Sequence, residues 1–326
     1  MYEEFFGLQG KPFQLSPDPR FFFESQGHRR ALAYLRYGIQ QGEGFVVVTG
    51  KVGTGKTTLA QTLFNDLGRN RNAVAAQIVT TQVEGEDLLR MVADGFGLAH
   101  EGKSKATLLH DLEAFLIQKR HERKRVLLLI DEAQNLPPSS LEALRMLSNF
   151  QEGRRPLLQS LLLGQAEFRQ TLQSPHLEQV RQRIIASCHL DPLSVEETER
   201  YIRHRLEQVA WNNDPELVPE AFTAIQRHTR GVPRRINTFC DRLLLFAYLE
   251  ELHRIEPGHV GTVAEELRGE IPEETRPEET RETAAPVPAG SRDRITALER
   301  RISVLEEALR HTRNGLNRLL VSEGQP

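Results

Sequence analysis

A glycine-rich octapeptide limits the folds open to this chain more than any other part of its sequence. Residues 50–57, GKVGTGKT, match the pattern G-x-x-x-x-G-K-[ST] at every fixed position. An apolar, β-rich run at 45–49 precedes them, and a helical pattern at 58–67 follows. Glycines let backbone N–H groups close around phosphate oxygens, and a helix N-terminus adds positive partial charge. A chance glycine-rich turn is the alternative, but the flanking elements favour a phosphate-binding loop.

The phosphate-loop pattern gives its residues separate roles. Lys56 is expected to reach the β- and γ-phosphates, and the Thr57 hydroxyl to ligate Mg²⁺. ATP and Mg²⁺ are therefore the expected cofactors. The residues expected to contact nucleotide here are Gly50, Val52, Gly53, Thr54, Gly55, Lys56, Thr57 and Thr58.

Two carboxylates follow a second apolar run. Residues 126–130, VLLLI, are uniformly apolar, as expected for a central parallel strand buried on both faces. Asp131 and Glu132 come directly after it, at the sheet edge where open α/β proteins bind ligands. We expect Asp131 to hold Mg²⁺ through its water shell and Glu132 to activate the attacking water. Capping of a following helix is the alternative.

Strand-like and helix-like patterns alternate through the first 190 residues. The strand-like runs are 45–49, 74–79, 126–130, 160–163 and 184–190; the helical patterns between them are 58–67, 87–96, 107–121 and 141–150. The alternation predicts an α/β fold with a five-stranded parallel sheet covered by helices. We therefore expect residues 1–192 to form a P-loop core.

Helical patterns dominate after residue 190. Ser194 and Glu197 have the spacing of a capping box, and helices are expected at 195–209, from Pro219 onward, and at 236–252. These patterns predict a small helical lid domain over 193–268.

The last part of the chain has a different composition. Residues 269–291 contain four prolines and six glutamates and too little apolar surface to fold, so an extended acidic linker is expected. Residues 292–322 carry a seven-residue apolar repeat that predicts a coiled coil. A lone amphipathic helix packing back on the body is the alternative. The seam residues are Ile295, Leu298, Ile302, Leu305, Leu309, Thr312, Leu316 and Leu319.

Charge and composition exclude several classes of protein. The net charge of −3 argues against nucleic acid as a partner, although a local basic run occupies residues 119–125. That run is interpreted as a solvated helix end. The start, MYEEFFGLQG, does not read as a signal peptide, and no apolar run is long enough for a membrane span. Cys188 and Cys240 lie in apolar contexts and are expected to be reduced packing residues rather than a disulfide.

Phosphoryl transfer also needs positive charge near the γ-phosphate. Two arginine-containing segments could supply it: QVRQRI at 179–184 and GVPRRIN at 231–237. Spacing alone assigns neither.

Taken together, the phosphate loop, DEAQNL at 131–136 and the GVPRRIN turn resemble an AAA+ ATPase. The opening YEEFFGLQGKPFQLSPDPRFFFESQGH, LRMLSNFQ at 144–151 and LLLGQAEFRQTL at 161–172 resemble the secretion ATPase family typified by component A of the general secretion pathway. Within that family the chain is most similar to the subgroup at PEP-CTERM/exosortase loci. The resemblance covers residues 1–268.

The resemblance implies further residue roles. Gln165 matches the position that senses the γ-phosphate, and Arg234 matches the lid arginine that contacts nucleotide. Arg183 matches the arginine that a neighbouring subunit supplies in trans, with Arg181 as a close rival. Residues 11–13 and 17–19 would run near the adenine. Better-known members continue into a membrane helix and a peptidoglycan-binding region, whereas a linker and a coiled coil are expected here.

The function expected from this resemblance is an AAA+ ATPase that hydrolyses ATP with Mg²⁺ to drive or regulate secretion or exopolysaccharide export. It would form a homo-oligomer in the cytoplasm and contact export components, through the coiled coil, at the inner face of the inner membrane. The alternative is a DNA-associated AAA+ ATPase of the transposition or replication-initiation type. A nucleotide-binding regulator with negligible turnover is a third reading, which the intact Glu132 disfavours.

Overall fold

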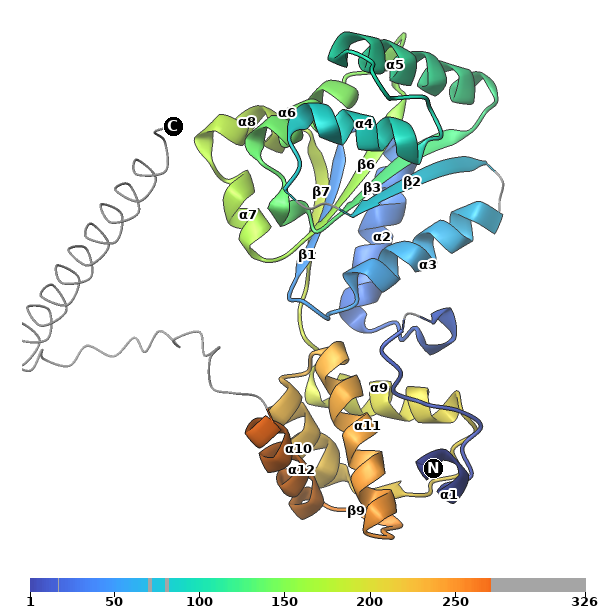
Figure 1. Cartoon of the computed structure of the whole chain (residues 1–326), viewed down its shortest axis with the longest axis vertical. Coiled ribbons are helices and arrows are strands. Elements are labelled where there is room, and N and C mark those ends of the chain that lie inside the picture. The colour runs from blue at the N-terminus through green and yellow to red at the C-terminus, as the bar shows by residue number, and fades with distance from the viewer. Residues whose placement is uncertain (17, 70–71, 80–81, 271–326) are drawn as a thin grey trace, which may run out of the picture. The chain divides into compact units, whose positions relative to one another are not determined.

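A five-stranded parallel sheet forms the centre of the protein (Figure 1). The structure is a computed structural model that describes residues 1–270 except 17, 70–71 and 80–81. The strand order is β2-β3-β6-β1-β7. The strands are β1 Phe45–Gly50, β2 Ala73–Val79, β3 Arg125–Asp131, β6 Leu158–Gly164 and β7 Ile184–Leu190. The predicted α/β fold and its five strands are confirmed.

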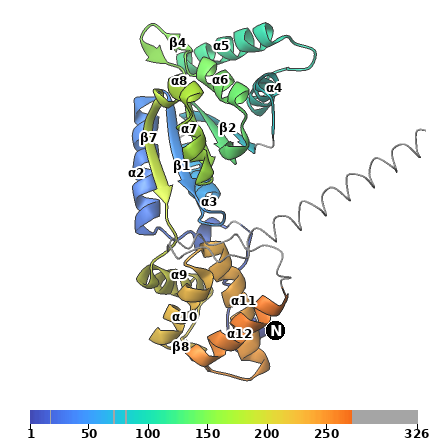
Figure 2. The same ribbon diagram turned by 90° about the vertical axis from the view of Figure 1, so that its left-hand side faces the viewer.

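Helices cover both faces of this sheet because alternate side chains of the central strands point in opposite directions. On one face Val47, Leu128 and Leu162 join a core with α4 Gly85–Gly95, α5 Lys105–His121, α6 Pro138–Leu147, α7 Glu167–Leu172 and α8 Glu178–Arg181. On the other face Val46 and Leu129 pack with α2 Gln26–Gln41 and α3 Lys56–Arg69. Figure 2 shows α2 and α7 on opposite sides of β1 and β7.

Four helices follow the sheet in sequence and build a separate hydrophobic core. They are α9 Val195–Glu207, α10 Pro219–Thr229, α11 Pro233–Leu249 and α12 Pro257–Glu270. The predicted capping box is present, since Ser194 Oγ accepts from Glu197 N and the Glu197 side chain accepts from Ser194 N. We call residues 193–270 the helical region.

The N-terminal residues pack with the helical region rather than with the sheet. Tyr2, Phe6, Phe13 and Phe21 belong to its hydrophobic core. Helix α1 Tyr2–Phe5 is also fastened by a hydrogen bond of 2.6 Å from the Tyr2 hydroxyl to Asp241 Oδ1. The first residues of the predicted 1–192 domain therefore share a core with helices that lie far along the sequence. The predicted boundaries at 192 and 268 stay a prediction.

Several short elements complete the described part. They are β4 Gln151–Glu152, β5 Arg155–Pro156, β8 Glu216–Leu217, β9 Arg254–Ile255 and the 3₁₀ turns Pro19–Phe21, Ala133–Asn135 and Pro175–Leu177. β4 pairs antiparallel with β5, and β8 pairs parallel with β9. Two-residue strands carry no alternation of apolar residues, so sequence patterns did not predict them.

Other sequence expectations have mixed outcomes. Cys188 and Cys240 are buried and free, as predicted. The described residues include no helix with the length and apolar character that crossing a membrane requires. The predicted coiled coil and nearly all of the predicted linker lie outside the described residues.

Candidate nucleotide-binding site

The predicted phosphate loop connects β1 to α3 and requires glycine at two positions. Gly53 and Gly55 have φ angles of +82° and +94°, which L side chains rarely adopt. A Cβ on Gly53 would lie 2.6 Å from Arg234 Cβ, and one on Gly55 would lie 2.8 Å from His28 Nε2. The glycines therefore let both neighbours approach the loop backbone.

Lys56 is held inside the loop. Its side chain is buried, with 6% of the residue exposed, and Nζ donates to the carbonyl oxygens of Gly50 at 2.9 Å and Lys51 at 3.1 Å. Burial lowers the pKa of Lys56, and the nearby carboxylates of Glu132 and Asp131 act in the opposite direction. The ammonium thus occupies the loop interior, where phosphate oxygens can replace the two carbonyls as acceptors.

Thr57 and Asp131 lie together at the start of α3 and the end of β3. The Thr57 hydroxyl donates to Asp131 Oδ2 at 2.6 Å, and Asp131 is only 4% exposed. Hydroxyl and carboxylate oxygens are the ligands that Mg²⁺ prefers, together with water and phosphate oxygens. No cluster of three or more His, Cys, Asp or Glu residues in the described ranges could hold a metal. The Thr57 hydroxyl and the Asp131 carboxylate are oxygen donors of the kind that Mg²⁺ prefers, so the pair fits a Mg²⁺ ion that binds together with phosphate.

Glu132 is oriented by two glutamines. Its backbone is left-handed, with φ +54°, and its N–H donates to Asp131 Oδ1 at 2.9 Å. Gln134 Nε2 donates to Glu132 Oε2 at 2.6 Å, and Gln165 Nε2 donates to the same oxygen at 3.4 Å. Gln165 N also donates to Gln134 Oε1 at 2.9 Å.

The contacts between Glu132 and the two glutamines form because β3 and β6 are adjacent strands of the sheet. β3 and β6 are neighbours with Ile130 opposite Leu162, so the residues after each strand meet at one edge. Gln165 was predicted by resemblance, and the structure brings it to Glu132. Gln134 was missed, although it lies two residues after Glu132 in the DEAQNL segment.

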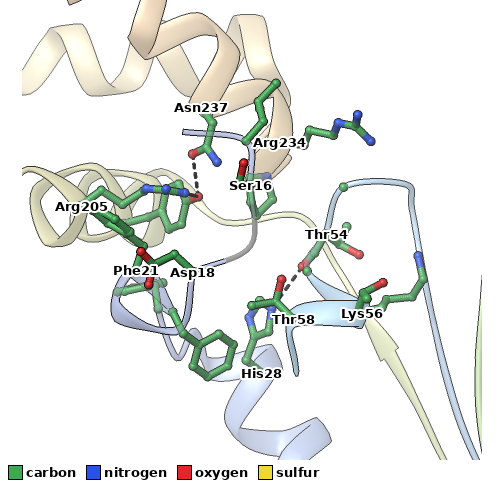
Figure 3. A pocket seen from close by; sticks show the side chains of 18 of the residues that line it. Ser16, Asp18, Phe21, His28, Thr54, Lys56, Thr58, Arg205, Arg234 and Asn237 are labelled. Carbon is green, nitrogen blue, oxygen red and sulfur yellow. Dashed lines mark hydrogen bonds between the residues drawn. The ribbon is translucent and has the colours of Figure 1, made fainter. Parts of the chain in front are cut away.

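A cavity of about 330 Å³ opens beside the phosphate loop (Figure 3). This volume is within the range of small-ligand sites. Predicted residues that line the cavity are Val52, Gly53, Thr54, Gly55, Lys56, Thr57, Thr58, Glu132 and Arg234. Gly50 and Asp131 do not line it but contact Lys56 and Thr57, which do.

The opposite wall of the cavity comes from the helical region. Arg234 N donates to the carbonyl of Gly53 at 3.2 Å, which joins the first turn of α11 to the phosphate loop. One turn later, Asn237 Oδ1 accepts from the Tyr201 hydroxyl at 2.7 Å. Burial raises the pKa of Tyr201, so the phenol stays a hydrogen-bond donor at neutral pH. Figure 3 shows Arg234 and Asn237 on the same side of the cavity.

Arg205 fastens the N-terminal segment to this wall. It is 5% exposed, and it donates from Nε to Pro12 O at 2.6 Å and from Nη2 to Gln14 O at 3.2 Å. Nη1 donates to the Tyr201 hydroxyl at 2.9 Å, and the guanidinium lies 4.7 Å from the centre of the Phe21 ring. Arg205 was not predicted from the sequence. The available signal was its position four residues after Tyr201, which makes the two side chains neighbours on one helix face.

The N-terminal segment itself forms part of the cavity lining. Gln14, Leu15, Ser16 and Asp18 line it, whereas residues 11–13 do not. Residues 11–13 and 17–19 were the two segments expected near the adenine. Among their described residues, Asp18 lines the cavity.

Arg183 lies at the other end of the sheet. It directly precedes β7, whose first residue pairs with Phe45, whereas the phosphate loop follows the last residue of β1. Its guanidinium contacts the Ser148 carbonyl and the Asn149 side chain. Arg181, also exposed, donates to Leu172 O at 3.2 Å. Neither arginine can reach the phosphate loop of its own chain, so a catalytic role would require a second copy and stays a prediction.

Comparison with known proteins connects this geometry to a family model. Residues 39–172 match the model described as the AAA domain. General secretion pathway protein A of Aeromonas hydrophila is 41% identical over 270 residues, which cover 82% of this chain and 49% of that protein. The chain thus spans about half the length of this curated relative.

Solved structures support the fold. Cdc6p from Pyrobaculum aerophilum matches with a TM-score of 0.61 and 16% identity, covering 78% of this chain and 70% of that one. The Aeropyrum pernix ORC2 protein in ADPNP–ADP complexes matches with a TM-score of 0.60 and 17% identity, covering 78% and 71%. At this identity the likeness shows the P-loop α/β fold alone.

Proposed function

We propose that the chain is an AAA+ ATPase that binds ATP with Mg²⁺ at residues 50–57 and hydrolyses it. The observation that carries this proposal is the position of Glu132. It lines the cavity that Lys56 and Thr57 also line, and Gln134 and Gln165 orient its carboxylate. A carboxylate fixed beside a phosphate loop suits activation of water better than structural capping.

In this proposal each residue has a distinct task. The loop N–H groups and Lys56 bind the phosphates, and Thr57 and Asp131 would hold Mg²⁺, which neutralises phosphate charge when bound. Glu132 orients water and accepts its proton, and Gln165 contacts the γ-phosphate. The helical region acts as the lid, with Arg234 turned toward the phosphates. The catalytic advantage comes mainly from electrostatic positioning.

The cellular role in this proposal is to drive or regulate secretion or exopolysaccharide export at a PEP-CTERM/exosortase system. The 41% identity to General secretion pathway protein A supports the secretion part of this role, and the PEP-CTERM/exosortase part rests on the sequence resemblance alone. The chain would assemble with its own copies and reach the inner face of the inner membrane through partner proteins bound by residues 292–322.

The direct test is release of inorganic phosphate by the full chain supplied with ATP, with Mg²⁺ and again with excess EDTA. We expect turnover that requires Mg²⁺. Absence of phosphate release at every protein concentration, despite nucleotide binding, would favour the regulator interpretation instead.

The variant Arg183→Ala tests whether a neighbouring copy supplies a catalytic arginine. Arg181→Ala is the matched comparison, because Arg181 is the alternative candidate for this role. If a neighbouring copy supplies Arg183, its loss lowers turnover on the order of a hundredfold without weakening ATP binding. Turnover of the wild type should then rise more than linearly with protein concentration. A protein that stays monomeric with ATP removes the case for either arginine.

A DNA-associated function is the second candidate, and one surface feature favours it. Arg123, which follows α5, Arg154 in the β4–β5 turn and Arg155 at the start of β5 are all exposed. Much of the neighbouring charge is internally paired, because Glu152 bonds Arg120 and His121, each at 2.9 Å. The ATPase rate with and without duplex DNA distinguishes the two functions; stimulation that fades steeply with salt would favour DNA.

A further inference from the structure

We infer that His28 and Glu197 are positioning residues that join the phosphate loop to the helical region through the N-terminus of α2. This inference rests on the proposed function. It adds a connection separate from the Arg234 contact.

His28 holds the backbone of the phosphate loop through a hydrogen bond. It is 6% exposed, its Nε2 lies 3.1 Å from the carbonyl oxygen of Thr54, and its Nδ1 lies 2.7 Å from Ser25 Oγ. Because a carbonyl oxygen only accepts, Nε2 must carry the hydrogen, and Nδ1 then accepts from the Ser25 hydroxyl. Burial lowers the pKa of His28, which keeps the ring in the neutral form that this pair of bonds needs.

Ser25 and Gln26 connect His28 to Glu197. Ser25 is the N-cap of α2, where its Oγ also accepts from His28 N at 3.2 Å. Gln26 is the first residue of α2. Its backbone N–H has no acceptor within the helix and donates to Glu197 Oε1 at 2.8 Å. The first N–H groups of a helix have no partner within the helix, so Glu197 supplies one from outside.

Glu197 also accepts a hydrogen bond at the start of a second helix. Its Oε2 accepts from the N–H of Ser194, the N-cap of α9, at 3.4 Å. One carboxylate therefore bonds the N-terminus of α2, which packs on the sheet, and that of α9, which belongs to the helical region. Residues 26 and 197 are 171 positions apart in sequence.

The consequence is a continuous path of contacts from Thr54 through His28, the start of α2 and Glu197 to the start of α9. Fixing the Thr54 carbonyl fixes the orientation of a peptide in the loop that binds phosphate. A shift of α9 against α2 would disturb Glu197 first and the loop next. The phosphate loop and the lid would thus be mechanically joined before nucleotide arrives.

Gln26→Pro tests this path with little disturbance elsewhere. It removes the N–H that donates to Glu197, yet proline is favoured at the first position of a helix. The preceding Ser25 has φ −64° and ψ 169°, a conformation suited to a residue before proline. The matched control is Lys105→Pro at the first position of α5, which follows the similarly extended N-cap Ser104. No described hydrogen bond joins the Lys105 N–H to a second helix.

The first readout is amide hydrogen exchange over residues 51–57 of the full, nucleotide-free chain. We expect exchange in Gln26→Pro to be about twofold to tenfold faster than in Lys105→Pro, the effect of about one hydrogen bond. Equal exchange in the two variants would overturn the inference. This readout needs no nucleotide, so its failure is distinct from failure of ATP binding.

The second readout is a double-mutant cycle on the same exchange rates with Gln26→Pro and His28→Leu. Residues on one path should show a combined effect smaller than the product of the single effects. Independent effects would contradict the path. His28→Gln, which keeps an N–H near the Nε2 position, should restore part of the protection lost in His28→Leu, whereas a merely space-filling role would not distinguish these two variants.

Discussion

The two walls of the cavity differ at the side chains nearest the phosphate loop. On the sheet side, Lys56 bonds two carbonyls, Thr57 bonds Asp131 and Glu132 bonds Gln134, all at 3.1 Å or less. On the helical side, Arg234 contacts the loop through its backbone N–H. Its side chain is exposed, and no described hydrogen bond or ion pair uses its guanidinium.

The two walls therefore contribute to ligand binding in different ways. The sheet side holds its groups in place by bonds that nucleotide and metal would replace, which keeps the cost of ordering them low. The helical side holds the N-terminal segment through the hydrogen bonds that Arg205 donates to Pro12 and Gln14, whereas no described hydrogen bond or ion pair holds the Arg234 guanidinium. Changes on the sheet side should therefore alter binding and chemistry directly, and changes on the helical side should alter closure or stability.

The largest expected effect is that of Glu132→Gln on the sheet side. The amide keeps the size of the side chain but cannot accept a proton, so turnover should fall by about 10²–10⁴-fold. ATP affinity should change little, because Lys56 and the loop remain. The measurement is steady-state phosphate release together with fluorescent nucleotide titration. Turnover like that of the wild type would remove Glu132 from the chemistry.

The next effect concerns stability on the helical side. Arg205→Leu leaves the carbonyls of Pro12 and Gln14 without their donor, and the free energy of unfolding should fall by about 2–4 kcal/mol. Arg200→Leu on the exposed surface of α9 is the control, with an expected change within about 0.5 kcal/mol. Denaturant titration measures both. Equal changes would show that the N-terminal segment is not anchored by Arg205.

Lys56→Ala returns to the sheet side. Loss of a charge-assisted contact to phosphate should weaken ATP binding by about tenfold to a hundredfold. Lys51→Ala is the matched control, because this exposed loop lysine contributes only its backbone carbonyl to the bonds described. Nucleotide titration compares the two. Similar affinities would mean that the loop does not place Lys56 on phosphate.

Arg234→Ala should give the smallest effect on the nucleotide-free protein. Its backbone bond to Gly53 is retained, so the melting temperature should stay near that of the wild type, while turnover falls by about tenfold. Arg235→Ala, the exposed neighbour, is the control. A large loss of stability in Arg234→Ala would contradict the view that its side chain waits for nucleotide.

The sheet and the sheet-side wall were predictable from sequence because their signals are local. Uniform apolar runs mark β1 and β3, and residues 50–57 and 131–132 are each continuous in the chain. The parallel sheet then brings the ends of β1, β3 and β6 to one edge, which places the loop, Glu132 and Gln165 together. Backbone topology, more than side-chain detail, assembles this wall.

The helical-side wall was not predictable in the same way. Arg205 contacts Pro12 across 193 positions, and Tyr201 contacts Asn237 across 36. No local pattern marks such partners, because the pairing depends on how α9, α11 and the N-terminal segment pack. Arg234 and the segment that contains Asp18 were found in advance, and both came from family resemblance. Helix α2 was also missed, although Ser25 caps its start and Gly42 with φ +75° ends it.

The most direct test of the account is the structure of the Glu132→Gln variant with ATP and Mg²⁺. We predict that Lys56 Nζ leaves the carbonyls of Gly50 and Lys51 and bonds phosphate oxygens, with Mg²⁺ beside Thr57 and Asp131 and the Arg234 guanidinium turned toward the phosphates. A nucleotide bound with Lys56 still on its two carbonyls, or with its phosphates outside residues 50–57, would contradict the account.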